Sequence, residues 1–262
     1  MPARKPTAES KSTEVISDIL KVSTGAFDCC ILGRSPLILN RMAMKALHEL
    51  LMPKGRKTAA EKATSLKHIP VDEYRASAHT IKDESAPTLL AVPSTAFKGS
   101  IRTAALDMPG AKKSQIGRLT YIEGDYVGVY GLPKLFMAIT RSADINKTPD
   151  VRTRCIVPHW ACYLTVTFVQ PLIRAQAVAN LLAAAGITVG VGDWRPEKGA
   201  GSFGQFSIVD KDDPEFLAVV KHGGRKAQQE GLDEPVCYDD ETTELLSWYD
   251  EERSRRQLKG VA

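Results

Sequence analysis

The pattern of apolar and polar positions predicts strands separated by helices. Three runs are short, apolar and rich in β-branched or aromatic residues, as strands are. These runs are FDCCILG (27–33), CYLTVTFV (162–169) and GQFSIV (204–209). In the second run Leu164, Val166 and Phe168 alternate with threonines, which predicts one buried face and one exposed face.

A helix is predicted directly after a fourth apolar run, LLAVP. Ser94 or Thr95 can cap its first turn, because serine and threonine oxygens accept hydrogen bonds from free backbone N–H groups. Phe97 and Ile101 are four positions apart and share one face, which we expect to be buried. Two basic residues fall on another face of this helix: Lys98 and Arg102.

A second helix is predicted from Pro171 to Gly186, because proline is common in the first turn of a helix and glycine just after the last. We expect its apolar residues to be buried against a sheet. These residues are Ala177, Leu181 and Leu182. A further helix is expected to begin at Pro36, where leucines, methionines and alanines recur at helical spacing.

Three other segments complete the pattern. Residues 118–131 are predicted to form two paired strands around a tight turn at Gly124. Residues 187–194 are expected to start another strand. Residues 139–154 contain four arginines or lysines and are expected to be a polar connection.

The order of these elements predicts an α+β fold. Strand, helix and strand over 162–209 form half of a ferredoxin-like unit, and the first strand with the helix near residue 100 can supply the matching half. We expect three regions, namely a mobile tail (1–25), a core domain with insertions (26–210), and a charged, helical C-terminal extension (211–262).

Charge divides the chain unevenly. Residues 211–262 contain 13 acidic and 8 basic residues, which leaves 27 basic and 18 acidic residues in 1–210. A basic body with an acidic tail favours a polyanion as partner. The alternative is that these charges are ordinary solvated surface charges that keep the protein soluble.

Several classes of protein are disfavoured by the composition. No apolar run approaches the roughly 20 residues of a membrane-spanning helix, and the first residues lack the apolar centre of a signal peptide. The five cysteines have no framework spacing, and we expect Cys29 and Cys30 to point to opposite faces of a strand. No spacing of histidine and cysteine predicts a metal site, and no cofactor is predicted.

The segment VGVGDWRPEKGAGSFGQF contains five glycines between Gly190 and Gly204. A dinucleotide or phosphate-binding loop would be followed by a helix, whereas here a strand follows. One interpretation is a plain glycine hairpin. The other is a backbone that a ligand can approach closely.

Aromatic and basic residues accompany these glycines. Trp194 and Phe203 flank the segment, where nucleic-acid bases can stack on them. Arg195 and Lys198 supply positive charge for phosphates. The alternative for the two aromatic residues is packing in the core. No GxSxG motif or triad predicts catalysis, and scattered aspartates such as Asp28 and Asp193 have no spacing that requires pairing.

Four runs of the chain resemble a family of tailed-bacteriophage proteins. They are GRSPLILNRM, VPSTAFKGSIRTAAL, ITRSADINKTPDVRTR and GVGDWRPEKGAGSFGQF, and together they extend over most of residues 27–210. This resemblance supplies a biological context but no activity.

A second resemblance is to the RAMP superfamily, the backbone subunits of CRISPR effector complexes. PSTAFKGSIRTAAL is similar to the RAMP segment that opens a helix beside the guide RNA, and residues 190–204 are similar to the RAMP glycine-rich loop. The resemblance implies a modified RNA-recognition-type sheet with helices on one face. It implies that the sugar-phosphate backbone meets Ser94, Lys98, Ser100 and Arg102, and that the loop is lined by Arg195, Lys198 and Ser202.

Together these patterns favour a non-catalytic phage protein that binds a single strand of RNA or DNA. The resemblance further implies a homo-oligomer along the strand, and we expect it in the cytoplasm of the host cell. Two alternatives stay open. One is a structural or interaction protein that contacts a phage or host protein, and the other is a metal-dependent nuclease that uses the aspartates.

Overall fold

The computed structural model describes residues 20–52, 66–141, 148–198 and 201–256, and its largest sheet has four antiparallel strands. Across the sheet the order is β10 (Phe206–Val209), β1 (Ser23–Gly33), β9 (Ala161–Gln170) and β5 (Thr120–Ile122). Two helices pack against each other beside this sheet, α4 (Ser94–Ala104) and α6 (Ala175–Thr188). The chain order β1–α4–β5–β9–α6–β10 with this strand order is the ferredoxin-like topology. The predicted fold class is confirmed.

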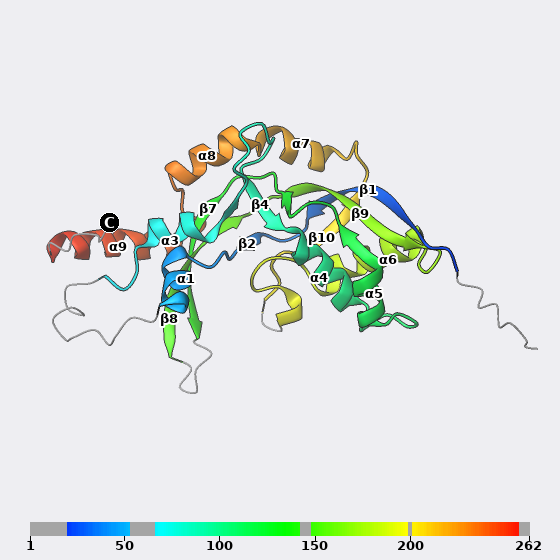
Figure 1. Ribbon diagram of the computed structural model, residues 1–262. Helices are drawn as coiled ribbons and strands as arrows, with labels where there is room; N and C mark the ends of the chain where they lie inside the picture. The colour runs from blue at the N-terminus through cyan, green and yellow to red at the C-terminus, as the bar shows by residue number, and fades with distance from the viewer. Residues whose placement is uncertain (1–19, 53–65, 142–147, 199–200, 257–262) are drawn as a thin grey trace, which may run out of the picture.

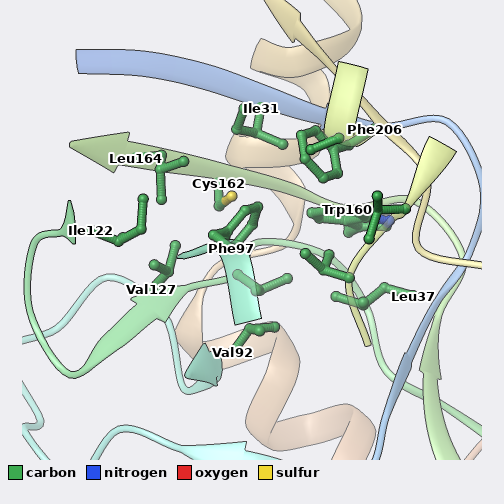
Figure 2. Packing of buried hydrophobic residues seen from close by; sticks show 14 of the residues in the cluster. Ile31, Leu37, Val92, Phe97, Ile122, Val127, Trp160, Cys162, Leu164 and Phe206 are labelled. Atoms are coloured by element: carbon green, nitrogen blue, oxygen red, sulfur yellow. The ribbon is translucent and has the colours of Figure 1, made fainter. Parts of the chain in front are cut away.

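The main core lies between this sheet and its helices. Figure 2 shows Phe97 of α4 at its centre, with Phe206 of β10 beside it and Val92 below. The rings of Phe97 and Phe206 are 5.6 Å apart, and both side chains are fully buried. Leu164, Val166 and Phe168 of β9 are also buried, as their alternation predicts. The two threonines between them, Thr165 and Thr167, are half-buried.

The helix α6 differs from its predicted limits. It begins at Ala175 rather than Pro171 and continues past Gly186 to Thr188. A Cβ on Gly186 would lie 2.1 Å from the carbonyl oxygen of Phe206, so this glycine lets the helix approach β10 and does not end the helix. Ala177 is exposed, contrary to prediction, whereas the two leucines of α6 are buried as predicted. No strand follows at 187–194, because α6 and then a loop occupy these residues.

A second sheet has three strands in the order β2 (Leu37–Leu39), β8 (Pro149–Val157) and β7 (Lys134–Arg141). The helix predicted to begin at Pro36 is therefore wrong at its start, and only α1 (Met44–Leu51) is helical there. All three residues of β2 are buried, and so short an apolar strand has the same pattern as part of a helix. The predicted polar connection over 139–154 is also wrong, because most of it pairs as β7 and β8. Residues 142–147 lie outside the described part.

A third sheet has the order β3 (His79–Thr80), β4 (Leu90–Pro93) and β6 (Tyr126–Gly128). The turn predicted at Gly124 is present, with φ at +76°. The strands on either side of it, β5 and β6, were predicted to pair with each other, but they do not. Each finds a longer apolar partner, β9 for β5 and β4 for β6.

The predicted cap of α4 is not formed. Pro93 occupies the N-cap position, no side chain caps the helix, and the N–H of Ser94 donates to the Asp125 carbonyl at 2.9 Å instead. The inward face of α4 is as predicted, since Phe97 and Ile101 are fully buried. The turn before β6 thus supplies an acceptor for the first N–H group of the helix.

The adjacent cysteines of β1 point to opposite faces, as predicted. Cys29 packs against the main core and its thiol donates to the Leu164 carbonyl at 3.4 Å. Cys30 belongs to a smaller cluster on the other side of the sheet, under α7 (Pro214–His222). In the described part of the chain, no helix is long and apolar enough to cross a membrane.

The described C-terminal region contains helices between residues 214 and 255, as predicted. After α7 come α8 (Arg225–Asp233) and α9 (Asp240–Arg255). In Figure 1, α7 and α8 extend across the top of the molecule, and α9 lies at the end that contains β7 and β8. The described residues also contain three shorter helical elements: α3 (Pro70–Ser77), α5 (Lys113–Leu119) and the 3₁₀ turn η1 (Pro196–Lys198). The tail predicted over 1–25 ends earlier than predicted, because residues 23–25 belong to β1. Residues 1–19 lie outside the described part of the chain.

Gln228 connects α8 to the rest of the fold. Its side chain is fully buried and bonds five backbone groups. The amide oxygen accepts from the N–H groups of Leu89 and Leu90, and the amide nitrogen donates to three carbonyls. Those carbonyls belong to Val129, Gly131 and Gly223. The extension is therefore part of the packed body.

We predict that Gln228→Leu lowers the free energy of unfolding by about 3–5 kcal/mol, because several buried backbone groups lose their partners. Gln229→Ala is the matched control, since the neighbouring glutamine is exposed and bonds only Asp233 among the described residues. It is expected to change stability by less than about 0.5 kcal/mol. Urea unfolding of both variants measures the difference. Equal stability of the two variants would show that Gln228 is dispensable.

Candidate nucleic-acid interface

The glycine-rich loop, of which residues 189–198 and 201–205 are described, follows the free edge of β2. The N–H of Asp193 donates to the carbonyl of Ile38 at 2.9 Å, and the N–H of Gly204 donates to that of Pro36 at 2.8 Å. The loop also closes on itself, with the Val191 N–H donating to the Gly204 carbonyl at 2.9 Å. These bonds satisfy the open edge of β2 and fix the position of the loop.

Most glycines of the loop are required by the loop itself. Gly190, Gly192 and Gly204 have φ between +70° and +82°, a region that favours glycine. A Cβ on Gly204 would lie 1.7 Å from the Val191 carbonyl oxygen, and one on Gly201 would lie 1.7 Å from that of Trp194. These close approaches explain the glycines without a ligand, which corrects the interpretation that a ligand requires them.

The aromatic residues of the loop turn towards the second sheet. The rings of Trp194 and Phe203 lie 6.0 Å and 6.3 Å from that of Phe136 in β7, and Tyr238 packs on the same ring. Both loop aromatics are half-buried. Trp194 has φ at +50°, a left-handed conformation that costs free energy in a residue with a side chain. Trp194 and Phe203 thus pack against β7, which agrees with packing in the protein rather than with base stacking, the two alternatives that the sequence left open.

A groove of about 420 Å³ separates the loop from α4. One wall is the outer face of α4, where Thr95, Gly99 and Thr103 follow one another at helical spacing. The opposite wall is the loop from residue 191 to residue 197. Figure 1 shows α4 and this loop, in yellow, on the same side of the strands. The structure thus brings together the two segments that the sequence singled out.

Gly99 forms an open part of this groove. It lies in the middle of α4, where glycine destabilises a helix by about 1 kcal/mol relative to alanine. A Cβ built on Gly99 would meet no atom within 4 Å, and the backbone is in the ordinary helical region. Neither packing nor backbone conformation in the described residues accounts for this glycine. It leaves the backbone of α4 accessible from the groove.

An ion pair crosses the loop side of the groove. The Arg195 guanidinium donates from Nε and Nη2 to one oxygen of Glu197, at 2.9 and 2.6 Å, and from Nη1 to the Gly192 carbonyl at 2.9 Å. Burial raises the pKa of Glu197, but the bond from Arg195 and the charges of Arg195, Lys198 and Lys113 outweigh it, so the pKa is lowered. Glu197 therefore lies among three cations.

Two of the cations that line the groove are unpaired in the described part of the chain. Arg102 of α4 and Lys113 of α5 have no ion-pair partner within 4.0 Å among the residues that the structure describes. The other acidic residue of the lining, Asp193, lies 4.0 Å from Arg154 of β8. Both acids of the groove are thus near arginines, and the unpaired charge on its walls is positive.

The other residues named from the sequence differ in where their side chains lie. Ser94 and Ser100 are buried, and the Ser100 hydroxyl lies 3.5 Å from the Ala185 carbonyl at the contact with α6. Lys98 points away from the groove, with its ammonium 4.2 Å from the centre of the Tyr121 ring. Ser202 is exposed on the loop. Of the sequence-derived set, Ser100, Arg102 and Arg195 line the groove.

The sequence missed the residues at the far end of the groove. His79 and Asn40 line it there, and the His79 ring lies 5.7 Å from that of Tyr126, which is 49% exposed. Burial and then the charge of Arg41 lower the pKa of His79, which favours its neutral form. These residues come from separate segments and have no motif in common. Gly99 did carry a signal, because it interrupts a predicted helix.

The aspartates considered for catalysis are not gathered. Asp28 lies on β1 and accepts a hydrogen bond from Thr165 at 2.7 Å, whereas Asp193 belongs to the loop. Across the described ranges, no group of three histidine, cysteine, aspartate or glutamate side chains is placed to bind a metal.

Comparison with protein-family profiles and with curated proteins finds no match. Among solved structures, Cmr6 from Pyrococcus furiosus is similar over 71% of this chain and 99% of its own, with 10% identity and a TM-score of 0.33. A type III-B Cmr-beta complex bound to cognate target RNA contains a chain similar over 72% of this one, with 11% identity and a TM-score of 0.35. This chain spans 60% of that second chain. Both similarities are too low to assign a function or a site.

We predict that Gly204→Ala disrupts the loop. The positive φ alone costs roughly 1–2 kcal/mol for alanine, and the clash with the Val191 carbonyl adds to it. Ser202→Ala, two residues away and exposed, is expected to leave stability unchanged. Urea unfolding measures both. A Gly204→Ala variant as stable as the parent would mean that the loop does not take the course described.

Proposed function

We propose that this protein binds a single strand of RNA or DNA in the groove between α4 and the glycine-rich loop, without cleaving it. The observation that carries the proposal is the open space over Gly99. A glycine in the middle of a helix lowers stability, and no contact among the described residues explains it here. A ligand that lies against the backbone of α4 would explain it.

The charges of the groove support a polyanion as this ligand. Arg102 and Lys113 offer unpaired positive charge on one wall, and Lys198 adds to it from the loop. Phosphate groups of a nucleic-acid strand are recognised mainly through such contacts. We retain Arg102, Arg195 and Lys198 from the sequence hypothesis as phosphate contacts and add Lys113.

Base stacking is assigned to the end of the groove rather than to the loop aromatics. Tyr126 is exposed, lies beside His79 and is paired through its backbone with Pro93, just before α4. An exposed tyrosine at the end of a cationic groove is a suitable platform for a base. Trp194 and Phe203 would then act indirectly, by holding the loop against β7.

The biological setting rests on resemblance alone. The four runs similar to phage proteins favour a phage protein in the cytoplasm of the host cell. The similarity of α4 and the loop to RAMP segments favours several copies side by side on one strand. A lack of cleavage is in keeping with the separate environments of Asp28 and Asp193.

One observation favours a second candidate function, contact with another protein. The helix α1 exposes three apolar side chains at helical spacing, Met44, Leu47 and Leu51, with exposed fractions of 52%, 37% and 79%. An exposed apolar stripe of this kind is common at protein–protein contacts. It lies outside the groove and is compatible with nucleic-acid binding.

We predict that Gly99→Ala separates stability from binding. Alanine in the open middle of α4 is expected to raise the free energy of unfolding by about 0.5–1 kcal/mol. The same methyl group would meet a strand lying on α4, so we expect affinity for single-stranded oligonucleotides to fall about tenfold, or 1.4 kcal/mol. Gly99→Leu is expected to lose more affinity and, because the space is open, little stability.

Fluorescence anisotropy with labelled single strands and urea unfolding measure the two effects. Asn180→Ala on the exposed side of α6 is the control, because it also raises helix propensity but lies outside the groove. It is expected to raise stability and leave affinity unchanged. If Gly99→Ala and Gly99→Leu bind as tightly as the parent, the groove is not the binding site.

A further inference from the structure

The carboxylate of Glu197 has the surroundings of a bound anion. Arg195 donates two hydrogen bonds to one of its oxygens, and the Thr103 hydroxyl of α4 lies 3.5 Å from the other. Lys113 and Lys198 are near enough for their charges to act on it. The side chain is 26% exposed, so solutes can reach it from the groove.

Arg195 has an anchor that does not involve Glu197. Its third hydrogen bond, from Nη1 to the Gly192 carbonyl, fixes the guanidinium to the loop backbone. Gly192 in turn lies against β2, where a Cβ would be 2.6 Å from the Ile38 carbonyl oxygen. If the carboxylate moved away, the bond to Gly192 would still hold Arg195, and two of its N–H donors would be free. Such a fork suits a carboxylate or a phosphate equally well.

Glu197 itself can move more easily than its partners. It lies in η1, a turn of three residues, and its residue is exposed. The described hydrogen bonds of its side chain are the two from Arg195 and one from Thr103, and the 3.5 Å of the last is long for a hydrogen bond. A rotation of its side chain would release the cations of both walls.

We propose that Glu197 occupies a phosphate site of this groove and that a phosphate group of the ligand displaces it. This deepens the proposed function and rests on it, because Glu197 then competes with the strand for the same cations. With the carboxylate removed, the position that it leaves would feel the positive charges of Arg195, Lys198 and Lys113. A phosphodiester, or a terminal phosphate with two charges, fits that position. Because Glu197 competes for these cations, an anion that binds them less strongly than a phosphate group would not displace it.

The test compares Glu197→Gln with the parent protein. Glutamine keeps an oxygen that accepts from Arg195 but removes the competing charge. We expect labelled single strands of about 15 nucleotides to bind roughly three- to tenfold more tightly, the scale of a partly exposed charge interaction. We also expect inorganic phosphate to raise the Tm of the variant more than that of the parent, because only binding to the folded state raises it.

Glu252→Gln is the matched control. Glu252 also accepts two hydrogen bonds from one arginine, Arg255, at 2.7 and 2.6 Å, but it belongs to α9, at the other end of the molecule from α4 (Figure 1). The variant has the same change in net charge. We expect its affinity to change by less than about twofold, because distant surface charges are screened.

The outcomes separate this inference from the proposed function. Tighter binding and a larger phosphate effect in Glu197→Gln, but not in Glu252→Gln, support it. If strands bind neither protein while phosphate still stabilises Glu197→Gln more, the anion site stands and the nucleic-acid function fails. If strands bind the parent and Glu197→Gln binds no more tightly than Glu252→Gln, the function stands and this inference is overturned. Weaker binding by Glu197→Gln would also overturn it, by showing that Glu197 only supports Arg195.

Discussion

The hydrogen bonds from the glycine-rich loop to the free edge of β2 determine where the candidate site lies. The loop belongs to the ferredoxin-like unit, between α6 and β10, whereas β2 belongs to the sheet of β7 and β8. Through Asp193 and Gly204 the loop therefore joins the two sheets. The packing of Trp194 on Phe136 strengthens the same junction. Without it, neither Arg195 nor Glu197 would face α4.

The glycines of this protein fall into two groups that the sequence does not distinguish. Gly192, Gly201 and Gly204 are needed because the chain passes too close to itself for a side chain. Gly99 has no such reason, since open space lies over it. A high density of glycine drew attention to the loop, yet the isolated glycine of α4 is the better indicator of a ligand. Only the three-dimensional surroundings of each residue reveal this difference.

The predictability of each element follows from its length and its burial. The strand β9 alternates over many residues, and α4 repeats Phe97 and Ile101 at helical spacing, so both were predicted correctly from local pattern. The strand β2 is too short to show a period, and β7 and β8 are stabilised by their mutual pairing rather than by composition.

The site was predictable only in part. Arg102 and Arg195 were found because they lie within compact motifs, and the structure places both on one groove. Lys113, His79 and Asn40 come from three other segments and meet there only through folding. Ser94 and Lys98 share a motif with Arg102, but the turn of the helix directs Ser94 into the core and Lys98 onto Tyr121. Proximity in sequence therefore did not imply a shared surface.

Photochemical cross-linking tests the central claim most directly. A single strand that carries a photoreactive uracil, irradiated with the intact protein and mapped by mass spectrometry, reports which residues lie against the bases. The account predicts cross-links at Tyr126 and His79 and in the peptide of α4 that contains Gly99. Cross-links confined to the opposite face of the four-stranded sheet, around Tyr163, would contradict it, because that face lies away from α4 and the loop.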